Sequence, residues 1–169
     1  MHVERFTTIQ RRAHFISAAL ITAFVIPGVA QAATANSAMP VSATVQATCS
    51  ITASPLAFGT YSSTQLDAAT TLAVNCTNTT SYNVGLDVGS GTGATVAQRK
   101  MANGAQTLNY TVYSDTGRAT LWGPTVGTNT VAGTGSGSVQ TLNVYGRIAA
   151  GQAPTPGSYA DTLTATVTY

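Results

Sequence analysis

The chain has 169 residues, of which 44% are hydrophobic and only 7% are charged, and its formal net charge is +2. Both histidines, His2 and His14, and the one glutamate, Glu4, precede position 15, so the rest of the chain has no imidazole for base catalysis or metal binding. The four aspartates and four basic residues beyond that point balance, which leaves no basic stripe for a nucleic acid. We therefore expect no enzymatic activity, cofactor, metal site or nucleic-acid partner.

Residues 1–32 have the three-part pattern of a secretory signal peptide. A basic segment is followed by the apolar run 15–29 and then by small residues suited to cleavage after Ala32. A membrane anchor is the alternative, but Pro27 interrupts the run, which is shorter than the roughly 20 residues of a spanning helix. We expect an exported mature chain without a membrane span, and the pair Arg11-Arg12 leaves the twin-arginine route open.

Two cysteines, Cys49 and Cys76, are the only ones in the chain. In an exported protein such a pair is most simply one disulfide. The bridge would close a loop of roughly 28 residues, for which the chain-entropy model gives about 3.5 kcal/mol of stabilisation. A metal-binding or reactive pair is the alternative, and it lacks a further set of ligands.

Alternating apolar and polar residues predict β-strands along the mature chain. Over residues 41–52 the alternation has a strict period of two, which is typical of a half-buried strand. Further strands are predicted over residues 71–76, 82–88, 107–113, 119–122, 139–148 and 159–169, with Gly-, Asn- and Ser-rich turns between them. No mature segment has a 3.6-residue apolar period over helical length. The sequence therefore predicts one all-β domain, an antiparallel β-sandwich.

Both ends of the mature chain are unusual for a closed sandwich. The last predicted strand, 159–169, alternates up to its final residue, and no lysine, glutamate or proline protects it beyond Asp161. The N-terminal stretch from Ala33 offers a second alternating segment behind loose polar residues. Together they could form a strand-addition joint, in which one chain donates a strand to the sheet of another. A terminal strand buried in its own sheet is an equally good interpretation of the residues alone.

Short motifs follow one another in order along nearly the whole mature chain. They are Cys49, Phe58-Gly59 with Tyr61, Asn75-Cys76-Thr77, Arg99 with Met101, Leu108-Asn109-Tyr110 with Val112-Tyr113 and Asp115, Trp122-Gly123, Tyr145-Gly146-Arg147, and Gly157-Ser158-Tyr159 with Asp161. As an ordered set they resemble the spore coat protein U domain family, which supplies subunits of archaic chaperone–usher pili.

This resemblance implies an incomplete immunoglobulin-like sandwich that lacks its last strand and is completed by donor-strand complementation. Residues 33–47 would be the donor-strand arm and residues 48–169 the sandwich domain. The expected partners are a periplasmic pilus chaperone, an outer-membrane usher and neighbouring pilin subunits. The expected location is the periplasm in transit and then a surface pilus, with a role in attachment or biofilm formation.

The same resemblance assigns roles to the two alternating ends of the mature chain. The donor strand is placed at about residues 37–46, with Val41 and Val45 as anchors and with Ala43 and Ala47 in shallower positions. The acceptor edge is expected to consist of Leu163, Ala165, Val167 and Tyr169.

A second class of function remains open, namely a non-polymerising secreted coat protein or an adhesin module that binds surfaces or carbohydrates. For the latter, Trp122 with Tyr110, Tyr113 and Tyr145 could form an aromatic platform, although core packing is the more ordinary role for such residues. A hydrolase is the third class, and only an aspartate pair could serve it.

Overall fold

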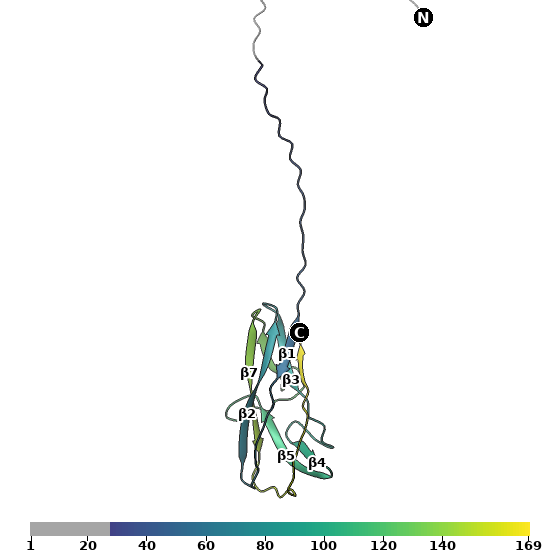
Figure 1. The fold of residues 1–169 in the computed structure, drawn as a ribbon, viewed down its shortest axis with the longest axis vertical. Coiled ribbons are helices and arrows are strands. Elements are labelled where there is room, and N and C mark those ends of the chain that lie inside the picture. Colours follow the sequence, from purple (N-terminus) through teal and green to yellow (C-terminus); the bar gives the residue numbers. More distant parts are fainter. Residues whose placement is uncertain (1–27) are drawn as a thin grey trace, which may run out of the picture. The chain divides into compact units, whose positions relative to one another are not determined.

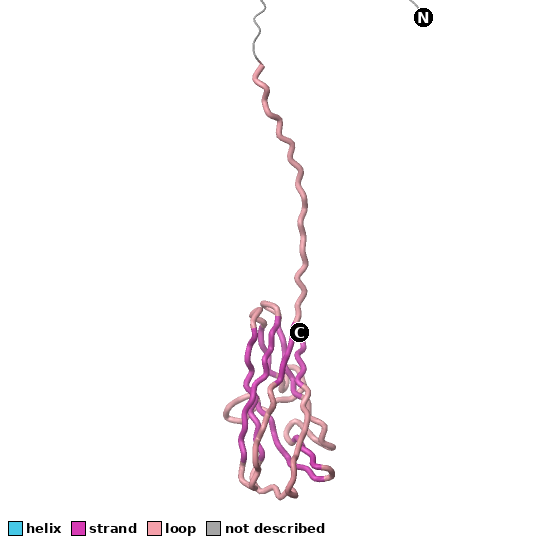
Figure 2. The backbone as a smooth tube through the Cα atoms, viewed as in Figure 1, coloured by secondary structure: helices cyan, strands magenta, loops and turns pink. Residues whose placement is uncertain are grey.

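The structure is a computed structural model, and it describes residues 28–169. Every regular element in that range is a β-strand (Figures 1 and 2). The strands are β1 (Cys49–Ala53), β2 (Leu66–Cys76), β3 (Ser81–Leu86), β4 (Arg99–Asn103), β5 (Gln106–Tyr113), β6 (Val131–Thr134), β7 (Val139–Ile148) and β8 (Ala165–Thr168). The predicted signal peptide, apart from residues 28–32, lies outside the described residues.

The chain divides into two units, Met1–Ser42, of which the structure describes residues 28–42, and Ala43–Tyr169. Within the first unit, the described residues 28–42 contain no strand and are all exposed. The second unit contains all eight strands. Within residues 28–169 the structure has no helix of the length and hydrophobicity needed to cross a membrane.

The strands form two antiparallel sheets, as the alternation in the sequence predicts. The larger sheet has the order β1-β2-β7-β5-β4, and the smaller has the order β6-β3-β8. The longest pairing joins β2 and β7 along ten residue pairs, and the two strands lie side by side in Figure 1. A bridge between Ala102 and Ala160 joins β4 to the segment that leads into β8, so the large sheet curls around toward the small one.

The predicted disulfide between Cys49 and Cys76 is present. It joins the first residue of β1 to the last residue of β2, which are also opposite each other in the strand register. Because β1 is a five-residue strand at the edge of its sheet, the disulfide ties a short edge strand to a strand that is paired on both sides.

The core lies between the two sheets and follows the period of two along each strand. In β5, for example, Leu108, Tyr110 and Val112 are buried, whereas the residues between them are only partly covered. The other buried hydrophobic residues are Leu72, Val74, Cys76, Tyr82, Val84, Leu86, Trp122, Val144 and Ile148.

Arg99 is fully buried in this apolar core. Its guanidinium donates hydrogen bonds to the backbone oxygens of Asp87 (2.9 Å), Val96 (3.2 Å), Leu86 (3.3 Å) and Trp122 (2.6 Å). Burial lowers the pKa of Arg99, but an arginine remains charged in proteins, so these oxygens must satisfy a buried cation. Arg99 thereby ties the start of β4 to the end of β3 and to the loop at Trp122.

Three predicted strands differ from those in the structure. The last, 159–169, is a strand only over Ala165–Thr168, and before it only Ala160 forms a bridge, to Ala102. Residues 119–122 form no strand and contribute only a single bridge between Leu121 and Tyr113, because Trp122 turns into the core and its indole nitrogen donates to the oxygen of Val84 (2.8 Å). The alternation over 41–52 becomes a strand only from Cys49, because residues 41–48 have no neighbouring strand to pair with. The short strands β4 and β6 were not predicted.

Replacing Arg99 by methionine should lower the free energy of unfolding by about 3 kcal/mol or more, because the backbone oxygens around it lose their donors while remaining buried. The neighbouring Lys100→Met is the matched control and should change stability by only about 0.5 kcal/mol, since its amine bonds one exposed backbone oxygen. Urea unfolding of the disulfide-intact chain measures both. Equal effects of the two substitutions would contradict the role given to Arg99.

Candidate strand-binding groove

A groove runs between two chain segments that do not pair with each other, and its smaller hollow is mainly apolar. One wall is formed by residues 53–61, which follow β1, and the other by residues 154–165, which lead into β8. The groove consists of two open hollows with volumes of about 470 and 710 Å³. Both hollows are lined by Leu56, Phe58, Met101 and Tyr159, so they are continuous.

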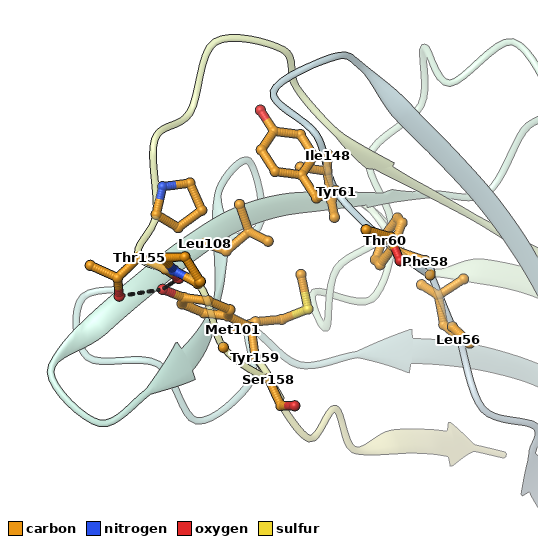
Figure 3. Close-up of a pocket in the computed structure, with 15 residues that line it drawn as sticks. Leu56, Phe58, Thr60, Tyr61, Met101, Leu108, Ile148, Thr155, Ser158 and Tyr159 are labelled. Carbon is orange, nitrogen blue, oxygen red and sulfur yellow. Dashed lines mark hydrogen bonds between the residues drawn. The ribbon is translucent and has the colours of Figure 1, made fainter.

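The floor of the groove is the hydrophobic core itself. Leu72 and Val144, from the central strands β2 and β7, lie beneath the smaller hollow together with Tyr110 of β5. Leu108 and Ile148 lie beneath the larger one. Figure 3 shows Leu108 and Ile148 behind the groove, with Met101 projecting between Phe58 and Tyr159. These floor residues are 1–5% exposed, so the core lies directly beneath the groove and only a small part of it faces the opening.

The two strands that adjoin the walls of the groove, β1 and β8, are both end strands, and each contributes one lining residue to the smaller hollow, Ala53 and Ala165. In the described part of the chain, β1 pairs only with β2, and β8 pairs only with β3. Each therefore has a second edge whose backbone N–H and C=O groups have no strand partner, and such an edge can bind an added strand.

The wall that leads into β8 is fixed by a polar cluster around Asp161. Its carboxylate accepts hydrogen bonds from the backbone N–H and the hydroxyl of Ser90 (both 2.8 Å) and from the hydroxyl of Tyr110 (2.7 Å). Burial raises the pKa of Asp161, but these hydrogen bonds outweigh it and the net pKa is lowered. Burial and the bond to the Asp161 carboxylate raise the pKa of Tyr110. The wall is therefore held to the floor of the groove by a charged hydrogen-bond acceptor.

The opposite wall is held by fewer contacts. The backbone N–H of Ser54 donates to the oxygen of Thr71 (3.0 Å), and the hydroxyl of Tyr61 donates to the oxygen of Ala149 (2.9 Å). Between these two points the ring of Phe58 packs edge-on against Tyr110, with their centroids 5.9 Å apart. This wall is therefore a loop that is hydrogen-bonded near both of its ends and packed against Tyr110 in its middle.

The structure places the four residues predicted for the acceptor edge in different surroundings. Leu163 and Ala165 line the smaller hollow. Val167 packs against the core but does not line either hollow, and Tyr169 is 59% exposed. Their role as acceptors remains a prediction.

Sequence reasoning missed the four residues shared by the two hollows, Leu56, Phe58, Met101 and Tyr159. None except Tyr159 falls in a predicted alternating strand. Phe58, Met101 and Tyr159 do belong to the ordered motifs that carry the family resemblance, and that was the available signal.

The residues predicted for the donor strand form no strand and are exposed. Val41 is 84% exposed and Val45 is 88% exposed, and Ala43 and Ala47 are exposed as well. Met39, at 82% exposed, extends the same alternation by one more step. The arm thus presents an apolar face with no partner among the described residues, and its role as a donor also remains a prediction.

The proposed aromatic platform does not form on the surface. Trp122 and Tyr110 are buried in the core, so they cannot join Tyr113 and Tyr145 in an exposed cluster. Arg118 instead lies over the ring of Tyr145, at 5.6 Å from its centroid. Among residues 28–169 no three His, Cys, Asp or Glu side chains lie close enough together to hold a metal ion.

The model of the spore coat protein U domain matches residues 35–166 of this chain. The chain belongs to the spore coat protein U domain family. One relative is Protein U of Myxococcus xanthus, which is 34% identical over 158 residues, covering 83% of this chain and 88% of the relative. The family assignment agrees with the resemblance found in the ordered motifs.

Among solved structures, this spore coat protein U domain is similar to a chain in the CsuC–CsuE chaperone–tip adhesion subunit pre-assembly complex from the archaic chaperone–usher Csu pili of Acinetobacter baumannii. The TM-score is 0.58 at 21% sequence identity, and the match covers 75% of this chain but only 41% of the other. At this identity the likeness concerns the fold. It agrees with an all-β fold of curled antiparallel sheets like that of chaperone–usher pilins.

Replacing Asp161 by asparagine should lower the free energy of unfolding at pH 7 by about 1–3 kcal/mol, because the bonds from Ser90 and Tyr110 lose a charged acceptor. Since folding lowers the pKa of Asp161, its contribution is complete above the unfolded value of about 3.9 and is lost as the pH falls through the folded pKa. The variant should therefore lose less stability than the native domain between pH 7 and about pH 2.

The control for this test is Asp67→Asn, on the outer face of the large sheet. The carboxylate of Asp67 pairs with Arg147 (2.8 Å) and also has a lowered pKa, but the pair is exposed and should contribute less than about 1 kcal/mol. Urea unfolding at both pH values compares the two variants. A cost at Asp161 no greater than that at Asp67 would contradict the anchoring role.

Proposed function

We propose that this protein is a structural subunit of an archaic chaperone–usher surface pilus. It polymerises by donor-strand exchange, in which the arm of one copy, residues 33–47, fills the groove of the next. The observation that carries the proposal is the open groove beside two unpaired strand edges, in a chain that also has an exposed arm with an alternating apolar face.

The chemistry of the arm matches that of the groove. A strand laid in the groove, along residues 53–61 or 154–165, offers backbone donors and acceptors to the adjoining wall, and every second side chain points to the floor. Burying Val41 and Val45 would contribute roughly 1.5–3 kcal/mol each. The free energy of completing the fold then drives assembly, and no nucleotide hydrolysis is needed.

The proposal includes an export route and two accessory partners. The open groove lies directly above the core, and a periplasmic chaperone would cover it until exchange takes place at an outer-membrane usher. The similar solved structure is that of a chaperone–tip adhesion subunit pre-assembly complex, which supports a partner of this kind. Residues 1–32 would act as the signal peptide, and the assembled protein would serve in attachment or biofilm formation.

A secreted coat protein is the second candidate. The name of the matching family, which refers to a spore coat, favours it. The same arm and groove could assemble a surface layer instead of a filament. Electron microscopy of cells with the protein labelled distinguishes a fibre from a layer.

Introducing a carboxylate on the apolar face of the arm should abolish polymerisation. Val41→Asp or Val45→Asp would bury an unpaired charge in the groove, which costs several kcal/mol, more than the valine contributes. Both residues are exposed in the chain itself, so the fold of the subunit should be unaffected. Size-exclusion chromatography with negative-stain microscopy of the purified mature chain measures the polymer.

Ser42→Asp and Thr44→Asp are the matched controls, because they add the same charge to the opposite face of the same segment. They should polymerise normally. If all four variants polymerise, or if all four fail, the apolar face of the arm is not the donor surface and the proposal is wrong.

A further inference from the structure

The two hollows of the groove meet at the residues that line both of them, and we call this meeting point the constriction. Met101 of β4 projects there between Phe58 on one wall and Tyr159 on the other (Figure 3). The hydroxyl of Tyr159 donates to the oxygen of Thr155 (2.8 Å), and Phe58 is packed against Tyr110, so both rings are fixed. The unbranched thioether of Met101 is the most flexible of these side chains.

The arm has a pattern of sizes that fits two hollows and one constriction. Along its apolar face the order is Met39, Val41, Ala43, Val45 and Ala47. In an extended strand the two valines are separated by about 13 Å, with the small side chain of Ala43 midway between them. Ala43 is the one small residue of the arm that has a valine on both sides.

Other placements of the arm fit less well. Shifting it by two residues in either direction puts Val41 or Val45 at the constriction, where a branched side chain would meet Met101. Shifting it by four residues toward its C-terminal end puts Ala47 there. With Ala47 there, Cys49 would have to enter the next hollow, but Cys49 is bonded to Cys76 in its own sandwich. Thr48 is also held, since its backbone N–H and C=O bond the side chain and the backbone N–H of Thr77. The free part of the arm therefore ends at Ala47.

We propose that Met101 sets the register of strand exchange between two copies of this chain. Ala43 of the incoming arm lies over Met101, and Val41 and Val45 occupy the two hollows on either side. This inference rests on the proposed function and adds a specificity-determining residue to it. A donor from another protein would be accepted only with a small residue between two larger ones at this spacing.

The register is tested by making residue 43 larger and residue 101 smaller, first separately and then in the same chain. Ala43→Leu should make polymers of the mature chain dissociate roughly tenfold or more faster, because the added methyl groups overpack the constriction. Met101→Ala in the same chain should restore most of the lifetime, because it opens the constriction. The measurement is the rate at which polymer releases subunits in dilute urea, followed by gel filtration.

The matched control is Ala47→Leu, which adds the same volume to the same face of the arm. Its effect on polymer lifetime should not be relieved by Met101→Ala. The proposed register is wrong if Met101→Ala restores the polymer lifetime of Ala47→Leu, or if it fails to restore that of Ala43→Leu. Neither outcome would contradict strand exchange itself. If the unsubstituted chain forms no polymer, the proposed function fails and the register fails with it. Circular dichroism and disulfide content of the monomers check that each variant is folded.

Discussion

The constraint on which this domain depends is that every buried backbone donor and acceptor needs a partner. The strands β1 and β8 each satisfy it on one edge only, and core side chains such as Leu72 and Val144 line the groove beside them. A soluble domain would normally cover such edges or protect them with charge and proline. We propose that the groove beside these edges receives one more strand, and the arm before Thr48 has the alternating pattern of such a strand.

The rest of the fold keeps this groove in shape before anything fills it. The disulfide fixes the beginning of β1, where the arm joins the sandwich. Arg99 ties β4 to the end of β3 from inside the core, and Asp161 attaches the wall before β8 to Tyr110 on the floor. Rigid walls reduce the entropy lost when a strand is added, because the receiving surface is already ordered. Arg99 and Asp161 would destabilise an apolar core if they had no hydrogen-bond partners. Here their hydrogen bonds hold in place the segments that surround the groove.

The sequence predicted those parts of the structure that depend on local pattern. The alternation along β2, β3, β5 and β7, the disulfide and the two-sheet architecture follow from period-two burial and from two cysteines in an exported chain. The short strands β4 and β6 could not be predicted, because neither alternates clearly and each owes its pairing to distant segments. For the same reason the sequence did not show that Phe58 and Met101 line one groove. They come together only when the loop after β1 passes over β4. The local pattern also could not show that residues 41–48 form no strand. A strand needs a neighbouring strand to pair with, and this segment has none among the described residues.

The most direct test of this account is a comparison of thermal unfolding for two forms of the mature chain. One lacks residues 33–46, and the other carries that segment fused through a flexible linker after Tyr169. The account predicts that the fused form is monomeric and melts far higher than the truncated form, because its own arm now completes the groove. A truncated form that is monomeric and melts at the same temperature as the fused one would mean that the sandwich is already complete, and strand exchange would be excluded as its function.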